Sequence, residues 1–264
     1  MRPLLIRFIV FVALASTLGA QDASVQPESL VFRARSSRFG GMGRASMWVA
    51  AAEPVRGEPV ALARFEFRTR VGFFTVEDKA ASWITGAGTE SLAAVRYTKR
   101  ERNPLMTRDE DVSIDLHRHR WSDRDGRNGT LETSRPLDEL SFIYFVRTLP
   151  RDTAGQLVVS RHFDAARNPV RVTILRRDTL ATPAGRFRVL EVEMRVRDPR
   201  YKGEGIIRFD LSDDSCRLPV RIRSSVPLAG TSTLTLESYV RPGAACAARL
   251  DAAAPRTLPV AEAL

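Results

Sequence analysis

Histidines and carboxylates are the first residues to consider for metal-binding or acid–base chemistry. The chain has three histidines, and His117 and His119 lie two positions apart on a segment predicted to be a strand. Side chains at that spacing point to one side of a strand, so together with Asp115 they could contact a metal ion. Neither an HExxH helix nor a further carboxylate at ligand spacing supports such a site. We therefore expect a polar, solvated strand face there and predict no metal.

Motifs of other catalytic chemistry are also missing from the sequence. No G-x-S-x-G turn is present to hold a nucleophilic serine. The glycine-rich segment 40–43 is not followed by the lysine of a phosphate-binding loop. The acidic run Asp109, Glu110 and Asp111 is expected to form a charged turn. We predict no catalytic residue and no cofactor, and an enzyme of unrecognised type is a less favoured alternative.

The two cysteines, Cys216 and Cys246, flank two predicted strands. If these strands form a hairpin that turns near residues 228–230, both thiols lie near its open end. We predict a disulfide between them, which suits an oxidising compartment; the alternative is two unpaired thiols. A zinc site is not expected, because no histidine lies near either cysteine in the sequence.

Most of the chain alternates apolar and polar residues with a period of two. This pattern is typical of antiparallel strands with one buried and one solvated face. We predict a mainly β fold, with a curved antiparallel sheet that forms a half-barrel or open barrel. The candidate apolar ligand face of this sheet consists of alternating strand positions, namely Phe65, Phe67, Leu190, Val192, Ile207, Phe209, Ile222 and Leu234.

One segment breaks the alternation and predicts the principal helix, at about residues 135–149. Ser134 could cap its N-terminus. The stretch 142–146 is apolar nearly all round, so the helix must be covered on most sides. We expect it to lie inside the curve of the sheet, where Phe142 and Phe145 would complete the apolar face.

Three segments, in this order, resemble the bacterial family of unknown function DUF3108. They are FEFRTRVGFFTVEDKAASWI at 65–84, RPLDELSFIYFVRTLP at 135–150, and a T-P-x-G-x-F turn followed by a D-x-x-x-x-P-V strand within 178–222. The second segment looks like the family's D-x-x-S-x-x-Y/F-x-x-R helix, matched here by Asp138, Ser141, Tyr144 or Phe145, and Arg147. The likeness covers roughly residues 44–240.

The resemblance implies a periplasmic protein whose sheet is similar to the half-barrel of Lol-type lipoprotein carriers. It brings no established activity and no catalytic residues to transfer. We expect a single β-rich domain of this type over residues 28–240. An alanine- and proline-rich tail over 242–264 is expected to be loosely ordered.

The N-terminus is typical of a secretory signal peptide over residues 1–20. Arg2 and Arg7 precede an apolar core that runs over residues 8–18. Ala20 is the expected last residue removed. The alternative is a membrane anchor, but a spanning helix needs about 20 apolar residues. No cysteine follows the cut to carry a lipid, so we expect an exported periplasmic or extracytoplasmic protein that is not a lipoprotein and has no later membrane span.

The formal net charge of +10 would suit a nucleic-acid-binding protein, but the arrangement of the charges does not. All but three of the 41 basic residues are arginines, spread over alternating strand positions and often beside acids. We do not expect nucleic acid as a partner. Attraction to anionic lipid head groups stays open.

The first functional hypothesis is a binding module that holds an acyl chain, or a partner's apolar segment, on the concave face. An equally weighted alternative is that these side chains pack on the helix and leave no cavity. The second hypothesis is a structural or assembly factor of the cell envelope that acts through a protein partner.

Overall fold

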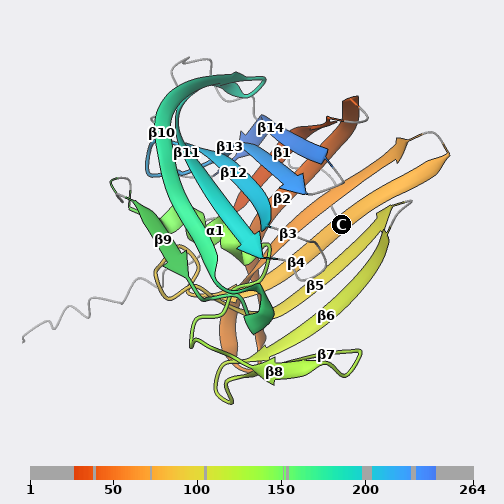
Figure 1. The fold of residues 1–264 in the computed structure, drawn as a ribbon, viewed down its shortest axis with the longest axis vertical. Helices are drawn as coiled ribbons and strands as arrows, with labels where there is room; N and C mark the ends of the chain where they lie inside the picture. Colours follow the sequence, from red (N-terminus) through yellow and green to blue (C-terminus); the bar gives the residue numbers. More distant parts are fainter. Residues whose placement is uncertain are drawn as a thin grey trace, which may run out of the picture.

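The computed structural model describes residues 27–37, 40–71, 73–103, 106–150, 152, 155–197, 204–226 and 230–241. The predicted signal peptide and tail lie outside these residues. The described part forms one fourteen-stranded antiparallel sheet, one α-helix and one 3-10 turn (Figure 1). The predicted fold class is confirmed, because the sheet is open and one helix accompanies it. None of the helical segments in the described part has the length and apolar character to span a bilayer.

The sheet is built from two runs of consecutive antiparallel strands. The first run comprises β1 (Glu28–Ser36), β2 (Gly40–Val55), β3 (Glu58–Val71), β4 (Phe74–Thr85), β5 (Ala93–Asn103), β6 (Met106–Asp115), β7 (Arg120–Asp123) and β8 (Asn128–Thr130). The second comprises β9 (Gln156–Val159), β10 (Val170–Thr182), β11 (Gly185–Arg197), β12 (Glu204–Ser212), β13 (Pro219–Val226) and β14 (Gly230–Val240).

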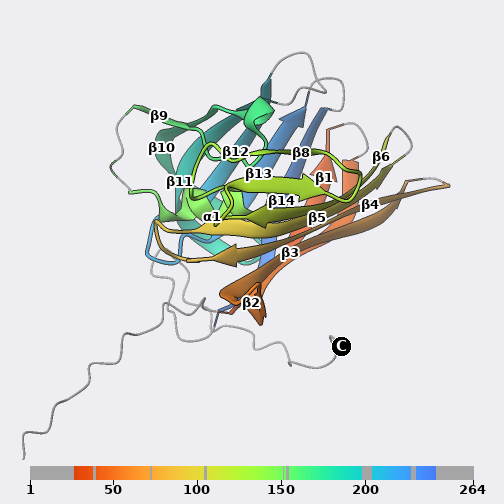
Figure 2. The same ribbon diagram turned by 90° about the horizontal axis from the view of Figure 1, so that it is seen from below.

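The two runs join through their outermost members in the sequence, because β1 pairs with both β2 and β14. Strands β8 and β9, neighbours in the chain, lie at the two opposite edges of the sheet. The sheet curls so that its two halves face one another, with the helix between them (Figures 1 and 2). One continuous apolar core therefore receives side chains from both halves and from the helix.

Hairpin turns form where the sequence predicts them. The turn over 182–185 links β10 to β11, with Thr182 paired to Gly185 and the glycine at a φ of 132°. That positive φ favours glycine over any residue with a Cβ. Strands β13 and β14 form the predicted hairpin, closed by the pairing of Val226 with Gly230.

Helix α1 spans Ser141–Thr148 and is shorter than the predicted helix. Residues 135–140 are not helical, since Leu137 forms an isolated parallel bridge with His162. Asp138, rather than Ser134, bonds the free backbone N–H groups at the start of the helix. Its Oδ1 accepts hydrogen bonds from the N–H groups of Leu140 (2.8 Å) and Ser141 (2.9 Å). A short carboxylate side chain that bonds the backbone in this way favours a helix start over a helix interior.

Two further local predictions were wrong. The segment with His117 and His119 is a turn between β6 and β7, not a strand, and His119 has a φ of 52°. The acidic run 109–111 is not a charged turn, because it lies inside strand β6 and pairs with β5. In both cases the sequence did not reveal where strand β6 ends, because charged residues occur both inside this strand and in the turn that follows it.

Candidate functional site

The structure brings the ten residues of the predicted apolar face together on the concave side of the sheet. Seven are buried in the shared core, namely Phe67, Phe142, Phe145, Leu190, Val192, Phe209 and Ile222. The other three pack against this core but are only partly buried, namely Phe65, Ile207 and Leu234. The face is therefore filled at one end and incompletely covered at the other.

Helix α1 fills the covered end. The ring of Phe142 stacks on His162 and meets Phe145 edge-on, with centroid distances of 6.2 and 6.1 Å. At the start of the helix, Ser82 Oγ of β4 donates a hydrogen bond of 2.5 Å to Asp138. At its end, Arg147 bonds Glu28 of β1. The helix is thus fixed to the sheet at both ends.

The less covered end has apolar side chains on both walls, and we call this group the mouth. Register places its members at inward positions, in line with buried neighbours such as Phe67 and Met194. All are partly buried and pack against the core, and the group consists of Phe65, Val76 and Ala80 on one wall and Ile174, Val196, Ile207 and Leu234 on the other. Incompletely covered apolar surface of this kind favours contact with an apolar group.

A cluster of buried and partly buried charges, centred on Glu139, lies against the inner side of strands β5 and β6. Its carboxylate accepts hydrogen bonds from Tyr97 Oη (3.1 Å), Lys99 Nζ (3.0 Å), Arg108 Nη1 (3.0 Å) and Arg167 Nη1. Burial alone would raise the pKa of Glu139, but the three cations outweigh it and hold that pKa well below its usual value. The carboxylate therefore stays ionised and ties β5, β6 and the 3-10 turn (Ala165–Arg167) to the segment just before the helix.

Two further carboxylates, Asp78 and Glu101, form a cross-strand pair between β4 and β5. Lys99 Nζ lies 3.9 Å from Asp78 and 3.8 Å from Glu101. Burial raises the pKa of both carboxyls, and Lys99 offsets only part of the effect. Asp78 lies between Val76 and Ala80 of the mouth on β4, so this wall offers polar as well as apolar groups.

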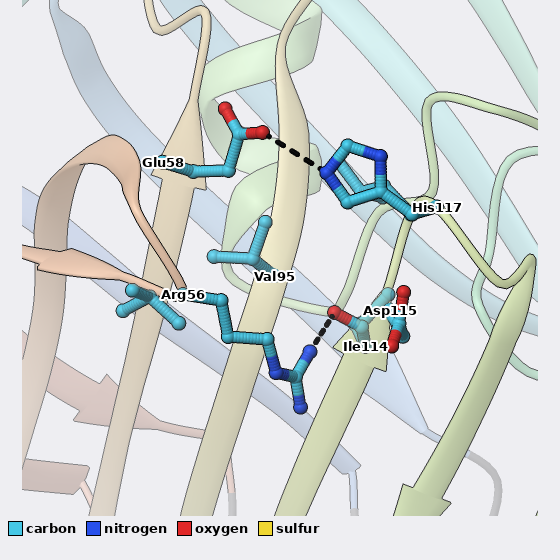
Figure 3. Close-up of a pocket in the computed structure, with 8 residues that line it drawn as sticks. Arg56, Glu58, Val95, Ile114, Asp115 and His117 are labelled. Carbon is cyan, nitrogen blue, oxygen red and sulfur yellow. Dashed lines mark hydrogen bonds and ion pairs between the residues drawn. The ribbon is translucent and has the colours of Figure 1, made fainter.

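The residues considered for a metal do not converge. His117 Nε2 lies 3.3 Å from Glu58 (Figure 3). Asp115, by contrast, accepts a hydrogen bond from the backbone N–H of Arg118. The cavity beside them measures about 20 Å³. Across the described ranges, no three His, Cys, Asp or Glu side chains are grouped so that they could hold a metal ion.

A larger depression of about 370 Å³ lies on the outer side of β3 to β6. Two outward-facing rows of side chains form its walls, one through Arg64 and Asp111 and the other through Glu66 and Asp109. The strand positions between these two rows form its floor, namely Phe65, Ala80, Lys99 and Glu110. Because charged side chains line most of this depression, it does not resemble an apolar ligand site.

Cys216 is buried in the connection between β12 and β13. Its carbonyl oxygen accepts hydrogen bonds from Arg147 (3.2 Å) and from Arg241 (2.8 Å), the residue that follows β14. The chain therefore leaves β14 close to Cys216, as the hairpin prediction requires. Cys246 lies outside the described residues, so the disulfide stays a prediction.

Sequence reasoning missed the inward-facing charges. Tyr97, Lys99 and Glu101 alternate on β5 just as apolar core residues do, and their inner face was indistinguishable from a solvated one. The nearest signal was the pair Asp138 and Glu139 beside an apolar helix, which placed carboxylates next to the core.

Comparison with known proteins supports the family and the fold. A family model described as "Protein of unknown function (DUF3108)" matches residues 32–237. No curated protein matches the chain. A β-barrel-like protein of the domain of unknown function DUF1849 from Brucella abortus is similar in structure, with a TM-score of 0.51 at 10% identity, over 84% of this chain and 100% of that chain.

Two other solved structures are more distant. One, from Bacteroides fragilis, is described as an exported protein with a YmcC-like fold; it has 12% identity and a TM-score of 0.34 over 83% of this chain and 97% of its own. The other, from Parabacteroides distasonis, is described as a lipoprotein; it has 11% identity and a TM-score of 0.31 over 82% and 96%. At these scores neither likeness bears on function.

Proposed function

Since this chain belongs to the DUF3108 family of proteins of unknown function, we propose a role from its own geometry. We propose that it is an exported, extracytoplasmic binding protein without catalytic activity. Its ligand is an amphipathic lipid whose acyl chain enters the mouth of the half-barrel. The observation that carries this proposal is the partial exposure of inward-facing apolar residues on both walls of the mouth.

The mouth is suited to a chain-like apolar ligand because its two walls belong to opposite halves of the sheet. Phe65 and Ala80 are paired on β3 and β4, whereas Ile207 lies on β12 of the second half. An acyl chain between them would remove apolar surface from water on both of its sides. Each Å² of apolar surface buried in this way contributes about 25 cal/mol.

The polar groups beside the mouth suit a head group. Lys99, which bonds Glu139, also lies within 4 Å of Asp78 and Glu101. Asp78 Oδ1 is buried without a hydrogen-bond partner. A ligand hydroxyl or amine placed there would satisfy this oxygen. The deeper core is already occupied by α1, so the ligand binds beside the helix and does not replace it.

Ile207 and its neighbour Ile206 provide a matched test. Ile207 faces inward opposite Met194, whereas Ile206 faces outward opposite Arg195, and both are partly buried. We expect the full chain, purified without detergent, to take up a fluorescent fatty acid, and Ile207→Asn to weaken uptake about tenfold. Ile206→Asn should leave it within about twofold.

Native mass spectrometry of the same preparations gives the second readout. A co-purifying lipid mass in the unaltered chain, reduced in Ile207→Asn, is the expected result. Absence of both lipid and uptake in the unaltered chain would refute the proposal, as would equal losses in the two variants.

A second candidate is an assembly factor that binds an envelope protein by strand addition. The observation in its favour is strand β9 at the edge of the sheet, where Val158 is 58% exposed. An edge strand has a free hydrogen-bonding side that can pair with an extended segment. Photo-cross-linking in cells from position 158 would give one dominant protein partner if this function holds.

A further inference from the structure

The outer face of the sheet has two adjacent rows of side chains that run across seven strands. Strand register defines both of them. The first row, from β10 to β2, is Arg176, Glu191, Asp210, Arg221, Thr235, Arg33 and Arg44. The second is Thr173, Glu193, Arg208, Arg223, Thr233, Arg35 and Gly41. We call them the arginine rows.

The rows point away from the core, because the residues between them on β11, β12 and β13 point into it. Val192, Phe209 and Ile222, for example, are buried on β11, β12 and β13. The rows contain seven arginines and three acidic residues. Glu237, two residues after Thr235 on β14, is a fourth acid, and it contacts Arg33 and Arg44 of the first row.

Acids and arginines in the rows differ sharply in exposure. The side chains of Asp210 and Glu191 are 3% and 6% exposed, whereas those of Arg223, Arg208 and Arg44 are 25%, 41% and 72% exposed. The carboxylates are covered by the guanidinium groups that bind them. The face therefore presents positive groups to its surroundings.

Each carboxylate in this region holds two arginines. Glu191 accepts hydrogen bonds from Arg176 (2.8 Å) and Arg223 (2.6 Å). Glu237 does the same with Arg44 (2.7 Å) and Arg33 (3.2 Å). An arginine already held by one carboxylate loses less side-chain freedom when it binds a second anion.

Like charges also stand directly opposite one another across strand pairs. Arg33 pairs with Arg44 on β1 and β2, and Arg208 pairs with Arg223 on β12 and β13. Such pairs weaken a sheet unless a counter-charge intervenes. Here a counter-charge does intervene, because Glu237 binds both Arg33 and Arg44 and Glu193 binds Arg208. Seven arginines still face four acids, so a net positive charge is left over for an external anion.

We propose that the arginine rows bind the anionic surface of a phospholipid membrane. Six strand spacings of about 4.8 Å make the rows roughly 29 Å long, measured along the curved outer face. Guanidinium groups bind phosphate in a bidentate manner. The rows contain no aromatic side chain on which nucleic-acid bases could stack, so a single-stranded nucleic acid is a poorer fit. This surface is separate from the mouth, and the inference does not depend on the proposed lipid ligand.

The test uses the full chain and vesicles of phosphatidylcholine, with or without about one third phosphatidylglycerol. We expect co-sedimentation only with the anionic vesicles, at low salt, and its loss in about 0.5 M salt. The triple variant Arg35→Gln, Arg44→Gln and Arg176→Gln leaves Glu191 and Glu237 one arginine each. It should reduce the partition coefficient at least about tenfold.

A control variant removes the same charge from exposed arginines elsewhere, with Arg102→Gln, Arg118→Gln and Arg120→Gln. It should bind within about twofold of the unaltered chain. A lysine version of the row variant keeps the charge and should bind within about fivefold. Equal losses in the row and control variants would show that net charge alone acts, and would overturn the proposal. Failure of the lysine version, or failure of the unaltered chain to prefer anionic vesicles, would overturn it as well.

Discussion

Arg147, in the last turn of helix α1, donates two hydrogen bonds of 2.5 and 2.7 Å to the carboxylate of Glu28, the first residue of strand β1. Both side chains are at least nine-tenths buried. Arg241 adds a third charge, 3.5 Å from the same carboxylate. The helix is thereby attached where the two halves of the sheet join, and the arginine of the family motif has a structural role.

Replacing Glu28 should therefore be costly. Glu28→Gln leaves Arg147 buried without its counter-charge, and we expect the free energy of unfolding to fall by about 3–5 kcal/mol in urea titrations at pH 7. The double variant Glu28→Leu, Arg147→Met removes both charges and should lose less than the single variant. Equal or greater loss in the double variant would contradict a charge-based account.

The pH dependence of this pair follows from its electrostatics. Burial would raise the pKa of Glu28, but the charge and hydrogen bonds of Arg147 outweigh it, so the pKa is lowered from 4.5. The stabilisation is complete above about pH 4.5, the pKa of the unfolded chain, and is lost as the pH falls through the folded value.

Asp138 should have the opposite pH dependence. Burial raises its pKa from 3.8 to about 6, and hydrogen bonds from Ser82, Ser141 and Leu140 limit the rise. The folded protein holds this proton more tightly, so stability is greatest below about pH 3.8 and falls as the pH rises to about 6, by roughly 3 kcal/mol. Asp138→Asn should remove this slope.

Unfolding titrations at pH 4.5 and 7.5 would compare Asp138→Asn with the unaltered chain. The asparagine can still accept the N–H hydrogen bonds that start the helix, so the variant should remain folded at both pH values. A slope unchanged by the substitution would mean that Asp138 does not titrate in this range.

His162 should make the fold sensitive to acid. Burial, and next the charge of Arg167, lower its pKa from 6.5 to about 3. The unfolded chain takes up this proton and the folded chain does not, so stability is lost as the pH falls from about 6.5 towards 3. His162→Phe keeps a ring against Phe142 and loses one hydrogen bond, from the N–H of Asp164.

The expected difference is measurable by urea unfolding. At pH 7.5 the His162→Phe variant should be about 1 kcal/mol less stable than the unaltered chain. At pH 4.5 it should gain roughly 2–3 kcal/mol relative to the unaltered chain. A difference that does not change with pH would show that His162 is protonated alike in both states.

The predicted bond between Cys216 and Cys246 can be tested by reduction. If it forms, a reductant should lower the stability of the unaltered chain by about 2–4 kcal/mol. Cys246→Ser should be less stable than the oxidised unaltered chain by a similar amount, and the reductant should not change its melting temperature. Peptide mapping under non-reducing conditions should recover the linked pair. Full stability of Cys246→Ser in oxidising buffer would argue against the bond.

The sequence predicts the strands well because one-sided burial leaves a clear alternation, as in Leu190, Val192 and Met194 of β11. It predicts the existence of α1 but not its start, since Asp138 offers the backbone a competing hydrogen-bond partner. Buried charges such as Lys99 are hidden by the same alternation, which does not tell an inner polar face from an outer one. Residues of the mouth other than Phe65, Ile207 and Leu234 were missed because partial exposure depends on how the two walls meet.

The pairing of β1 with β14 also constrains how the protein is made. Leu30 lies beside Tyr239, about two hundred positions later in the chain, and contacts of such long range slow folding. During synthesis β1 can pair with β2 as soon as both leave the ribosome, but its other edge stays bare until the last described strand emerges. A truncation before β14 would expose that edge in the middle of the sheet, and we would expect such fragments to aggregate.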